Sequence, residues 1–104
     1  MITWVAIEEC VAPHRVSHPE KLDKLTEAIA KGWGSGYPAL IGYKTFGRIQ
    51  LLSGSHRIEA AKRAGLKKIP VEIRNINEVW EAWGDLEKWR LLMTASEVTN
   101  ESAE

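Results

Sequence analysis

Hydrophobic and polar residues follow two different periods along the chain, and together they predict strands interleaved with helices. Residues 3–7, TWVAI, alternate large and small apolar side chains with β-branching and predict an opening strand. Residues 18–31 carry apolar side chains at three- and four-residue spacing, which predicts an amphipathic helix; they are Leu22, Leu25 and Ile29. Gly32 is a natural end for this helix.

The start of this helix carries a capping signal. Ser17 is followed three residues later by Glu20, which is the spacing of a capping box. Pro19 lies in the first turn, where its missing N–H removes no helical hydrogen bond. We therefore expect Ser17 and Glu20 to cap the helix.

The middle of the chain predicts a β-hairpin that leads into a second helix. Two short apolar segments, 38–43 and 48–53, flank the sequence KTFG, with Gly47 in the turn. Residues 55–64 predict a helix that ends at Gly65. The side chains expected to face the sheet are Ile58, Ala61 and Ala64.

A last strand is predicted over residues 67–73. Pro70 lies inside it and indicates an edge strand or a bulge, because proline donates no ladder hydrogen bond. The order β, α, β, β, α, β predicts an α/β (α+β) fold with a small mixed sheet, formed by residues 1–75.

The chain changes character after this strand. Residues 76–94 carry tryptophan and leucine at helical spacing, with a break or bend at Gly84, and predict a helical extension packed on the domain. Residues 95–104 are polar and acidic, and we expect them to be disordered.

Three tryptophans in this extension have three interpretations: Trp80, Trp83 and Trp89. The favoured one is that they close a small core, since a domain of this size has a marginal core. The second is a surface that binds a protein partner or a second copy of the chain. The third, stacking on nucleic-acid bases, is disfavoured by four neighbouring carboxylates: Glu78, Glu81, Asp85 and Glu87.

Length and charge narrow the function classes. The 104 residues suit one domain with one core, and 14 basic residues balance 14 acidic ones, so the chain lacks the positive excess typical of nucleic-acid or membrane binding. A local basic face remains open. Cys10 is the single cysteine, and no signal-peptide pattern or apolar run of about 20 residues occurs, so we expect a soluble cytoplasmic protein.

The most informative segment lies where the second strand of the hairpin meets the next helix, and its residues are Ser53, Gly54, Ser55, His56 and Arg57. The first amides of a helix have no internal acceptors, and glycine lets a ligand approach the backbone closely. Such a turn favours an anion, with arginine gripping phosphate oxygens. The plainer interpretation is that a serine caps the helix and Arg57 is a surface charge.

This segment resembles the ParB/sulfiredoxin superfamily. LLSGSHRIEAAKRAGLKKIPVEI has the family's strand, glycine turn, alanine-containing helix, glycine and IPV strand, while VAPHR, PEKLDKLTEAIAKGW and PALIGY match the upstream elements in order. The resemblance covers roughly residues 3–73 and implies the fold of that family. It also implies a nucleotide at the Gly54 turn, because Gly54, His56 and Arg57 match the family's phosphate cradle.

The matching positions do not all carry the same residue types. Sulfiredoxins have their redox cysteine where this chain has Ser55, so sulfinic-acid reduction is not expected, since an alcohol cannot replace the thiolate. Partition proteins of the ParB type have Gly-Glu-Arg-Arg at the turn, so Gly54 and Arg57 match while Ser55 and His56 differ.

The free-serine kinases provide a third comparison. Their turn begins with an aspartate where this chain has Ser53, and Arg15 stands where their upstream glutamate is expected, so two acidic groups are missing. By contrast, Lys21 matches a helix lysine that contacts phosphates in sulfiredoxin-like members, and Lys24 lies one turn further along. The resemblance therefore favours phosphate binding over kinase chemistry.

Two function hypotheses follow. One is a nucleotide-dependent enzyme, a hydrolase of nucleoside triphosphates, a nuclease or a small-molecule kinase, using ATP or another nucleotide with or without Mg²⁺ and a base such as Glu8, Glu9 or Glu59. The other is a non-catalytic regulatory or protein-interaction module with a degenerate nucleotide site. No metal site is predicted, because His14 and His18 are separated from other metal-binding residue types.

Overall fold

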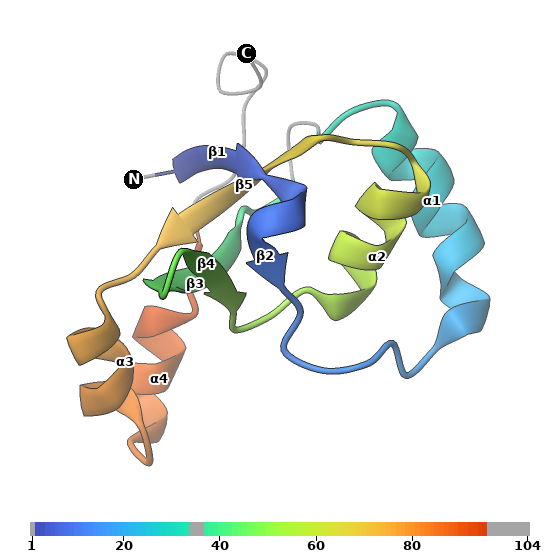
Figure 1. The fold of residues 1–104 in the computed structure, drawn as a ribbon. Helices are drawn as coiled ribbons and strands as arrows, with labels where there is room; N and C mark the ends of the chain where they lie inside the picture. Colours follow the sequence, from blue (N-terminus) through green and yellow to red (C-terminus); the bar gives the residue numbers. More distant parts are fainter. Residues whose placement is uncertain (1, 34–36, 96–104) are drawn as a thin grey trace.

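The computed structural model describes residues 2–33 and 37–95, in which a mixed sheet packs against two pairs of helices (Figure 1). The five strands lie in the order β1-β5-β3-β4-β2. Their bounds are β1 Ile2–Ala6, β2 Cys10–Val11, β3 Leu40–Thr45, β4 Arg48–Leu51 and β5 Lys68–Ile73. The helices in these ranges are α1 Leu22–Ala30, α2 Ser55–Arg63, α3 Ile76–Ala82 and α4 Leu86–Leu92.

The strands pair in both directions, as a mixed sheet requires. β1 is antiparallel to β5 and β3 to β4, whereas β5 is parallel to β3 and β4 to β2. The predicted α+β fold is confirmed, and the predicted elements occur in the expected order, with the short strand β2 added between the first strand and the first helix. The sequence missed two short elements, the 3₁₀ turn η1 Ile7–Glu9 and strand β2, which carry the chain from one edge of the sheet to the other.

The main core lies between the sheet and the α1–α2 pair. Alternation along the strands directs Ile49, Leu51, Ile69 and Val71 to one face of the sheet, where all are buried. α1 and α2 cover this face with side chains that are likewise buried: Leu22, Ile29, Ile58, Ala60 and Ala61. The small alanines of α2 let the two helices approach closely, and this packing fixes the start of α2 beside the start of α1.

Pro70 does not mark an edge strand, because β5 lies between β1 and β3. The expectation was wrong for a local reason. Pro70 pairs with Trp4 of β1, but the register between β5 and β3 begins one residue later, at Leu40 with Val71. The missing N–H of proline therefore falls before the ladder with β3 starts.

The capping box expected at Ser17 and Glu20 does not form. The chain enters the helix through a 3₁₀ turn, η2 Pro19–Lys21, and α1 begins only at Leu22; no side chain caps either start. The Glu20 carboxylate instead lies 3.3 Å from Nδ1 of His18. The tight turn and this contact draw Glu20 away from the position that a capping box needs.

The C-terminal extension is a helical hairpin rather than one bent helix. Gly84, at φ 81°, makes the turn between α3 and α4, and each helix has its own cap. The N–H of Asn77 donates to Oδ1 of Asn75 at 2.8 Å, and the N–H of Lys88 donates to Oδ1 of Asp85 at 3.1 Å.

A small second core holds this hairpin against the sheet. Val79, Ala82 and Leu92 are buried and pack against partly buried Tyr43, Leu52 and Trp89. The sequence-based interpretation of the tryptophans as core residues is wrong for Trp80 and Trp83, which are 69% and 72% exposed. Helical spacing predicts that an apolar face exists, but not what covers it.

Two further expectations concern the C-terminal tail and membrane-spanning helices. The predicted disordered tail lies outside the described residues from position 96 onward. In the described part of the chain, no helix has the length and apolar character to span a bilayer.

Candidate functional site

A glycine in a left-handed conformation begins α2. After β4 ends at Leu51, the chain turns at Gly54, which has φ 86° and ψ 31° and occupies the N-cap position. A Cβ atom at this position would overlap the Leu40 side chain. Both the backbone angle and the space therefore require glycine, as expected for the turn.

No serine caps α2, so the plainer interpretation of this turn is wrong. Ser55 is buried, and its Oγ lies 3.4 Å from the N–H of His14, from which it accepts a hydrogen bond. Ser53 precedes the turn and is half-buried. Within residues 2–33 and 37–95, the N–H groups of Ser55, His56 and Arg57 meet no acceptor. Unpaired amides of this kind favour an anion.

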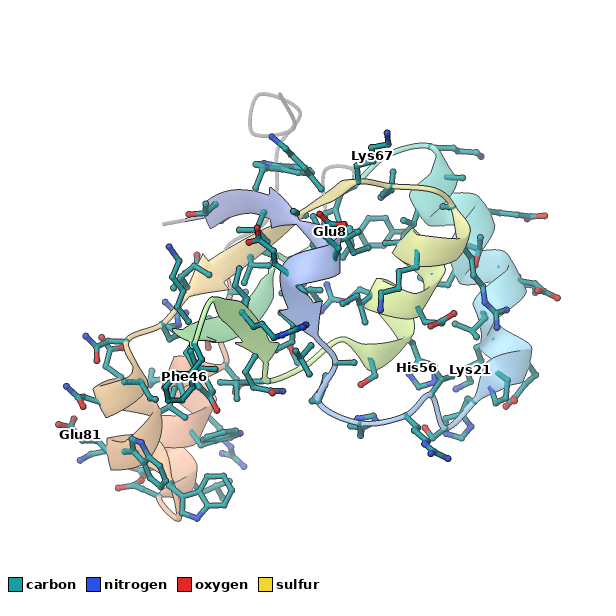
Figure 2. The ribbon with its side chains drawn as sticks, in the orientation of Figure 1. Glu8, Lys21, Phe46, His56, Lys67 and Glu81 are labelled. Atoms are coloured by element: carbon teal, nitrogen blue, oxygen red, sulfur yellow. The ribbon has the colours of Figure 1, made fainter. Side chains whose placement is uncertain are left out.

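Three of the predicted site residues meet in one cavity beside this helix start: Lys21, Lys24 and His56. The cavity has a volume of about 650 Å³ and lies between η2, α1 and the first turn of α2. Figure 2 shows Lys21 and His56 on facing elements at this end of the helix pair. The other lining residues are His18, Glu20, Leu25, Ala28 and Tyr37.

The two histidines of this cavity are linked. The backbone N–H of His18 donates to Nε2 of His56 at 3.1 Å, and the rings stack with their centroids 5.9 Å apart. Because Nε2 accepts this bond, His56 carries its proton on Nδ1 when neutral. His56 thus ties the segment before α1 to the start of α2.

Glu20 introduces a negative charge at the rim of the same cavity. Its own backbone N–H and the His18 side chain hold the pKa of Glu20 below its ordinary value. The carboxylate is therefore ionised at neutral pH and partly offsets the charges of Lys21 and Lys24.

Arg57 does not line this cavity, although the sequence predicted that it grips phosphate. Its NH1 atom donates to the carbonyl oxygen of Pro38 at 2.7 Å, and its guanidinium lies 5.6 Å from the centre of the Trp33 ring. Burial lowers the pKa of Arg57. Arg57 therefore connects α2 to the segment that precedes β3 through these two contacts.

Arg15 and Ser55 line a second, smaller hollow, of about 280 Å³, together with other residues of the segment 12–19 and of α2. Lys62 and Arg63 also line it, and Arg63 pairs with Glu59 at 3.2 Å. The predicted site residues are thus divided between two neighbouring hollows and the turn that separates them.

The structure brings none of the proposed bases into the cavity of Lys21 and His56. Glu59 lies in the second hollow, and Glu8 and Glu9 lie on η1. The cavity residues that sequence reasoning missed are His18, Glu20 and Tyr37. The only sequence signal for them is that His18 and Glu20 lie next to Lys21 in the chain and that Tyr37 shortly precedes β3. The hydrophobic pattern of the chain does not show which side chains line the same cavity.

Cys10 takes no part in this site. It is buried in β2, its Sγ lies 3.7 Å from the carbonyl oxygen of Ala6, and burial raises the pKa of its thiol to about 11. The reactive thiolate is therefore disfavoured at neutral pH. Among the residues that the structure describes, no group of three or more metal-binding side chains occurs.

Solved structures with this fold include proteins of different activities. ParB from Caulobacter crescentus, complexed with CTP-gamma-S, is 25% identical with a TM-score of 0.62, over 88% of this chain and 49% of that chain. Sulfiredoxin from Arabidopsis thaliana is 25% identical with a TM-score of 0.61, over 80% of this chain and 97% of that chain.

A free serine kinase in complex with AMP shares the fold at 16% identity and a TM-score of 0.60, over 81% of this chain and 32% of that chain. This chain therefore matches about half of the ParB chain and a third of the kinase. A search of curated proteins found no match.

The resemblance to the ParB/sulfiredoxin superfamily, drawn from residues 3–73, is confirmed by these neighbours. The model of the ParB N-terminal domain matches residues 2–83. Because this match spans most of the chain, the protein belongs to the ParB N-terminal domain family.

Proposed function

We propose that this protein binds a nucleotide in the cavity between α1 and the start of α2. The observation that carries the proposal is the meeting of Lys21, Lys24 and His56 beside the first turn of α2, whose first three amide N–H groups meet no acceptor among the described residues. Two cations and a helix N-terminus together favour a phosphate group. Ser53 and Gly54 form the turn behind the phosphates, and Arg15 and Ser55 approach from the neighbouring hollow.

The apolar part of the cavity lining suits the base of the nucleotide. Leu25, Ala28 and Tyr37 supply apolar and aromatic surface there. Similar proteins have been crystallised with CTP-gamma-S, AMP and ADP, which supports a nucleotide as the ligand class. ATP is the first candidate ligand, and its binding is to be compared with that of other nucleotides, each with and without Mg²⁺.

Binding is best measured by thermal unfolding with ATP, ADP, CTP, GTP and pyrophosphate, each with and without Mg²⁺. A ligand at 100 times its Kd adds about 2.7 kcal/mol of stability, which raises the midpoint by roughly 10 °C or more in a domain of this size. Lys21→Ala and Lys24→Ala should abolish the shift. Lys31→Ala, an exposed lysine at the C-terminal end of α1 that does not line the cavity, should keep it.

The same experiment separates binding from turnover. Since Glu8, Glu9 and Glu59 do not line the cavity, we propose a regulatory module that binds nucleotide without rapid hydrolysis, in a cytoplasmic setting that suits a protein with one cysteine. Release of phosphate that Lys21→Ala abolishes would support the enzyme hypothesis instead. No midpoint shift with any ligand would overturn nucleotide binding.

A second proposed function is protein binding through the α3–α4 hairpin. The observation that favours it is the exposure of Trp80 and Trp83, large apolar side chains that a monomer rarely leaves in water together. A variant with both replaced by serine should lose protein binding while retaining the nucleotide-induced midpoint shift.

A further inference from the structure

Charge is divided unevenly along the chain. Residues 1–74 contain twelve basic and seven acidic side chains, whereas residues 75–104 contain two basic and seven acidic ones. The chain is neutral as a whole because a basic part is joined to an acidic part. Opposite charges on separate surfaces favour contacts between molecules.

The α3–α4 hairpin combines negative charge with exposed apolar surface. Besides Trp80 and Trp83, Leu86 and Leu91 are 65% and 76% exposed, and Trp83 and Leu86 line an open apolar hollow together with Trp89. The hairpin carries four acidic residues, Glu78, Glu81, Asp85 and Glu87, against two basic ones, Lys88 and Arg90, so its net charge is negative. Two such hairpins facing each other would bring like charges together, so a basic partner surface is favoured.

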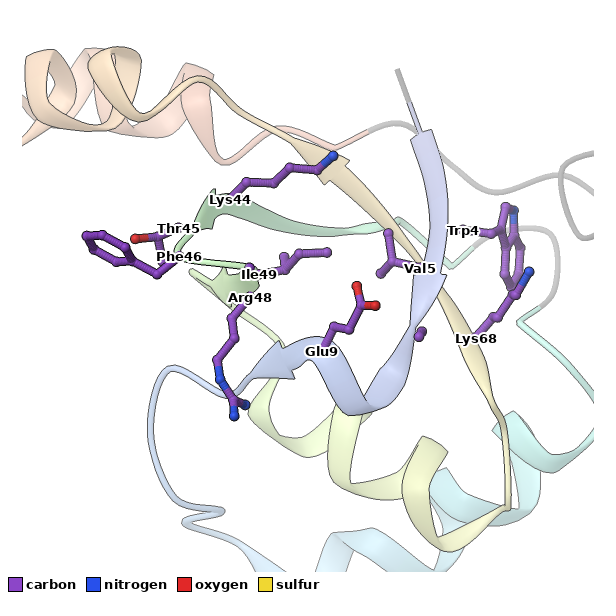
Figure 3. A pocket seen from close by; sticks show the side chains of 11 residues that line it. Trp4, Val5, Glu9, Lys44, Thr45, Phe46, Arg48, Ile49 and Lys68 are labelled. Atoms are coloured by element: carbon purple, nitrogen blue, oxygen red, sulfur yellow. The ribbon is translucent and has the colours of Figure 1, made fainter.

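A hollow lined by basic side chains on the same molecule offers such a partner surface. It occupies about 530 Å³ between β1–η1 and the β3–β4 hairpin (Figure 3). Val5, Ile49 and Glu9 point into it. Its basic residues are Lys44, Arg48 and Lys68, and Phe46, at the tip of the β-hairpin, is fully exposed. The hollow therefore offers apolar contacts within a rim of net positive charge.

The acidic hairpin and the basic hollow lie on opposite faces of the β3–β4 hairpin. Tyr43 contacts the small core under α3 and α4, whereas the next residue, Lys44, lines the hollow with Ile49, its partner in the register. Successive residues of a strand point to opposite faces. A chain consequently cannot place its own α3–α4 hairpin in its own hollow, but a second copy can.

We propose that the α3–α4 hairpin of one copy binds in the basic hollow of a second copy. Trp83 and Leu86 contact the exposed Phe46 of the second copy above the floor that its Val5 and Ile49 form, while the acidic side chains of the hairpin face its Lys44, Arg48 and Lys68. This proposal rests on the second proposed function, protein binding by the hairpin. Because the two surfaces differ, the contact is head-to-tail, and each copy can add another.

Sedimentation equilibrium over a range of protein concentrations tests this directly. The average mass should rise above the 11.7 kDa of one chain as concentration increases, and should fall again at high salt, which screens the charges. Trp83→Ser in the hairpin and the double variant Lys44→Glu, Arg48→Glu in the hollow should each remain monomeric. Lys31→Glu, a single lysine-to-glutamate change outside the hollow, should associate like the wild type.

Mixing the two monomeric variants gives the decisive result. Trp83→Ser retains an intact hollow and the double variant retains an intact hairpin, so an equal mixture should form a species of twice the monomer mass that does not grow further. All three substituted side chains are exposed, so the fold should tolerate them, and thermal midpoints check this.

Two results would overturn the proposal. If the hollow variant associates by itself like the wild type, the hairpins pair with each other. If the wild type remains monomeric at every concentration, no second copy binds at all. Neither result bears on nucleotide binding. Binding of a different protein by the hairpin is tested separately, by the variant in which Trp80 and Trp83 are replaced by serine.

Discussion

Gly54 shows how one residue can determine the geometry of the candidate site. Its positive φ and its contact with Leu40 both exclude a side chain. We expect Gly54→Ala to lower the free energy of unfolding by about 3 kcal/mol, since the left-handed conformation and the overlap each cost roughly 1–2 kcal/mol. Urea unfolding measures this.

Gly47 provides the matched control for this substitution. It has φ 76°, but a Cβ atom there would meet nothing within 4 Å. Gly47→Ala should therefore cost only about 1 kcal/mol, the conformational part alone. Equal losses for both variants would mean that Leu40 moves aside and that packing does not require glycine at Gly54.

Arg57 is expected to behave as a structural residue rather than as a phosphate ligand. Arg57→Ala removes a 2.7 Å hydrogen bond to Pro38 and the contact with Trp33, and should lower the free energy of unfolding by about 1–2 kcal/mol. The remaining folded protein should still show the nucleotide-induced midpoint shift. A variant that is as stable as the wild type but has lost the shift would contradict this assignment.

At the scale of the elements, Arg74 connects β5 to the end of α4. Its Nε donates to the carbonyl oxygen of Leu92 at 3.0 Å, its NH2 donates to that of Thr94 at 2.6 Å, and its NH1 lies 2.9 Å from the buried Glu72 carboxylate. The Leu92 carbonyl is among those that the end of a helix leaves without partners, and Thr94 follows the helix directly after its C-cap residue.

Arg74→Ala should therefore loosen the α3–α4 hairpin and destabilise the protein by about 2–4 kcal/mol, because it removes two charged hydrogen bonds and the ion pair with Glu72. Hydrogen exchange should accelerate most in residues 86–93. Arg90→Ala, which replaces an exposed arginine of α4 itself, should change neither measurement. Uniform acceleration over the whole chain would show that Arg74 supports the main core instead.

The elements also show how far the sequence predicts this structure. Periodicity located α1, α2 and the β3–β4 hairpin, because each places a run of apolar residues on one face long enough to detect. It missed β2, whose two residues have no period, and the 3₁₀ turn that replaced the capping box at Ser17. Both are set by tertiary contacts rather than by local preference.

The candidate site was predictable to a similar degree. The turn at Gly54 and the lysines of α1 were found from residue types and family resemblance, and Lys21, Lys24 and His56 do line one cavity. The position of Arg57 could not be foreseen, because its partners Pro38 and Trp33 lie about twenty residues away in sequence. Side-chain direction at such a distance depends on how the elements pack.

At the scale of the whole molecule, the structure contains two cores of unequal size. The larger one joins the sheet to α1 and α2, whereas the smaller one has three buried side chains, Val79, Ala82 and Leu92. The candidate nucleotide cavity is lined only by residues between His18 and His56, so it depends on the larger core alone. This division leads to the proposed domain boundary after residue 75.

A fragment of residues 1–75 should therefore fold and keep the candidate site. Without the hairpin, Tyr43 and Leu52 lose the side chains that pack on them, and Arg74 loses its two carbonyl partners, so the fragment should unfold at a lower temperature than the full chain. It should nevertheless show a cooperative transition by circular dichroism and the same nucleotide-induced midpoint shift. If the fragment shows no cooperative transition, the small core and the large core form one folding unit. The α3–α4 hairpin would then be needed to stabilise β3 and β5, and the sheet would not form without it.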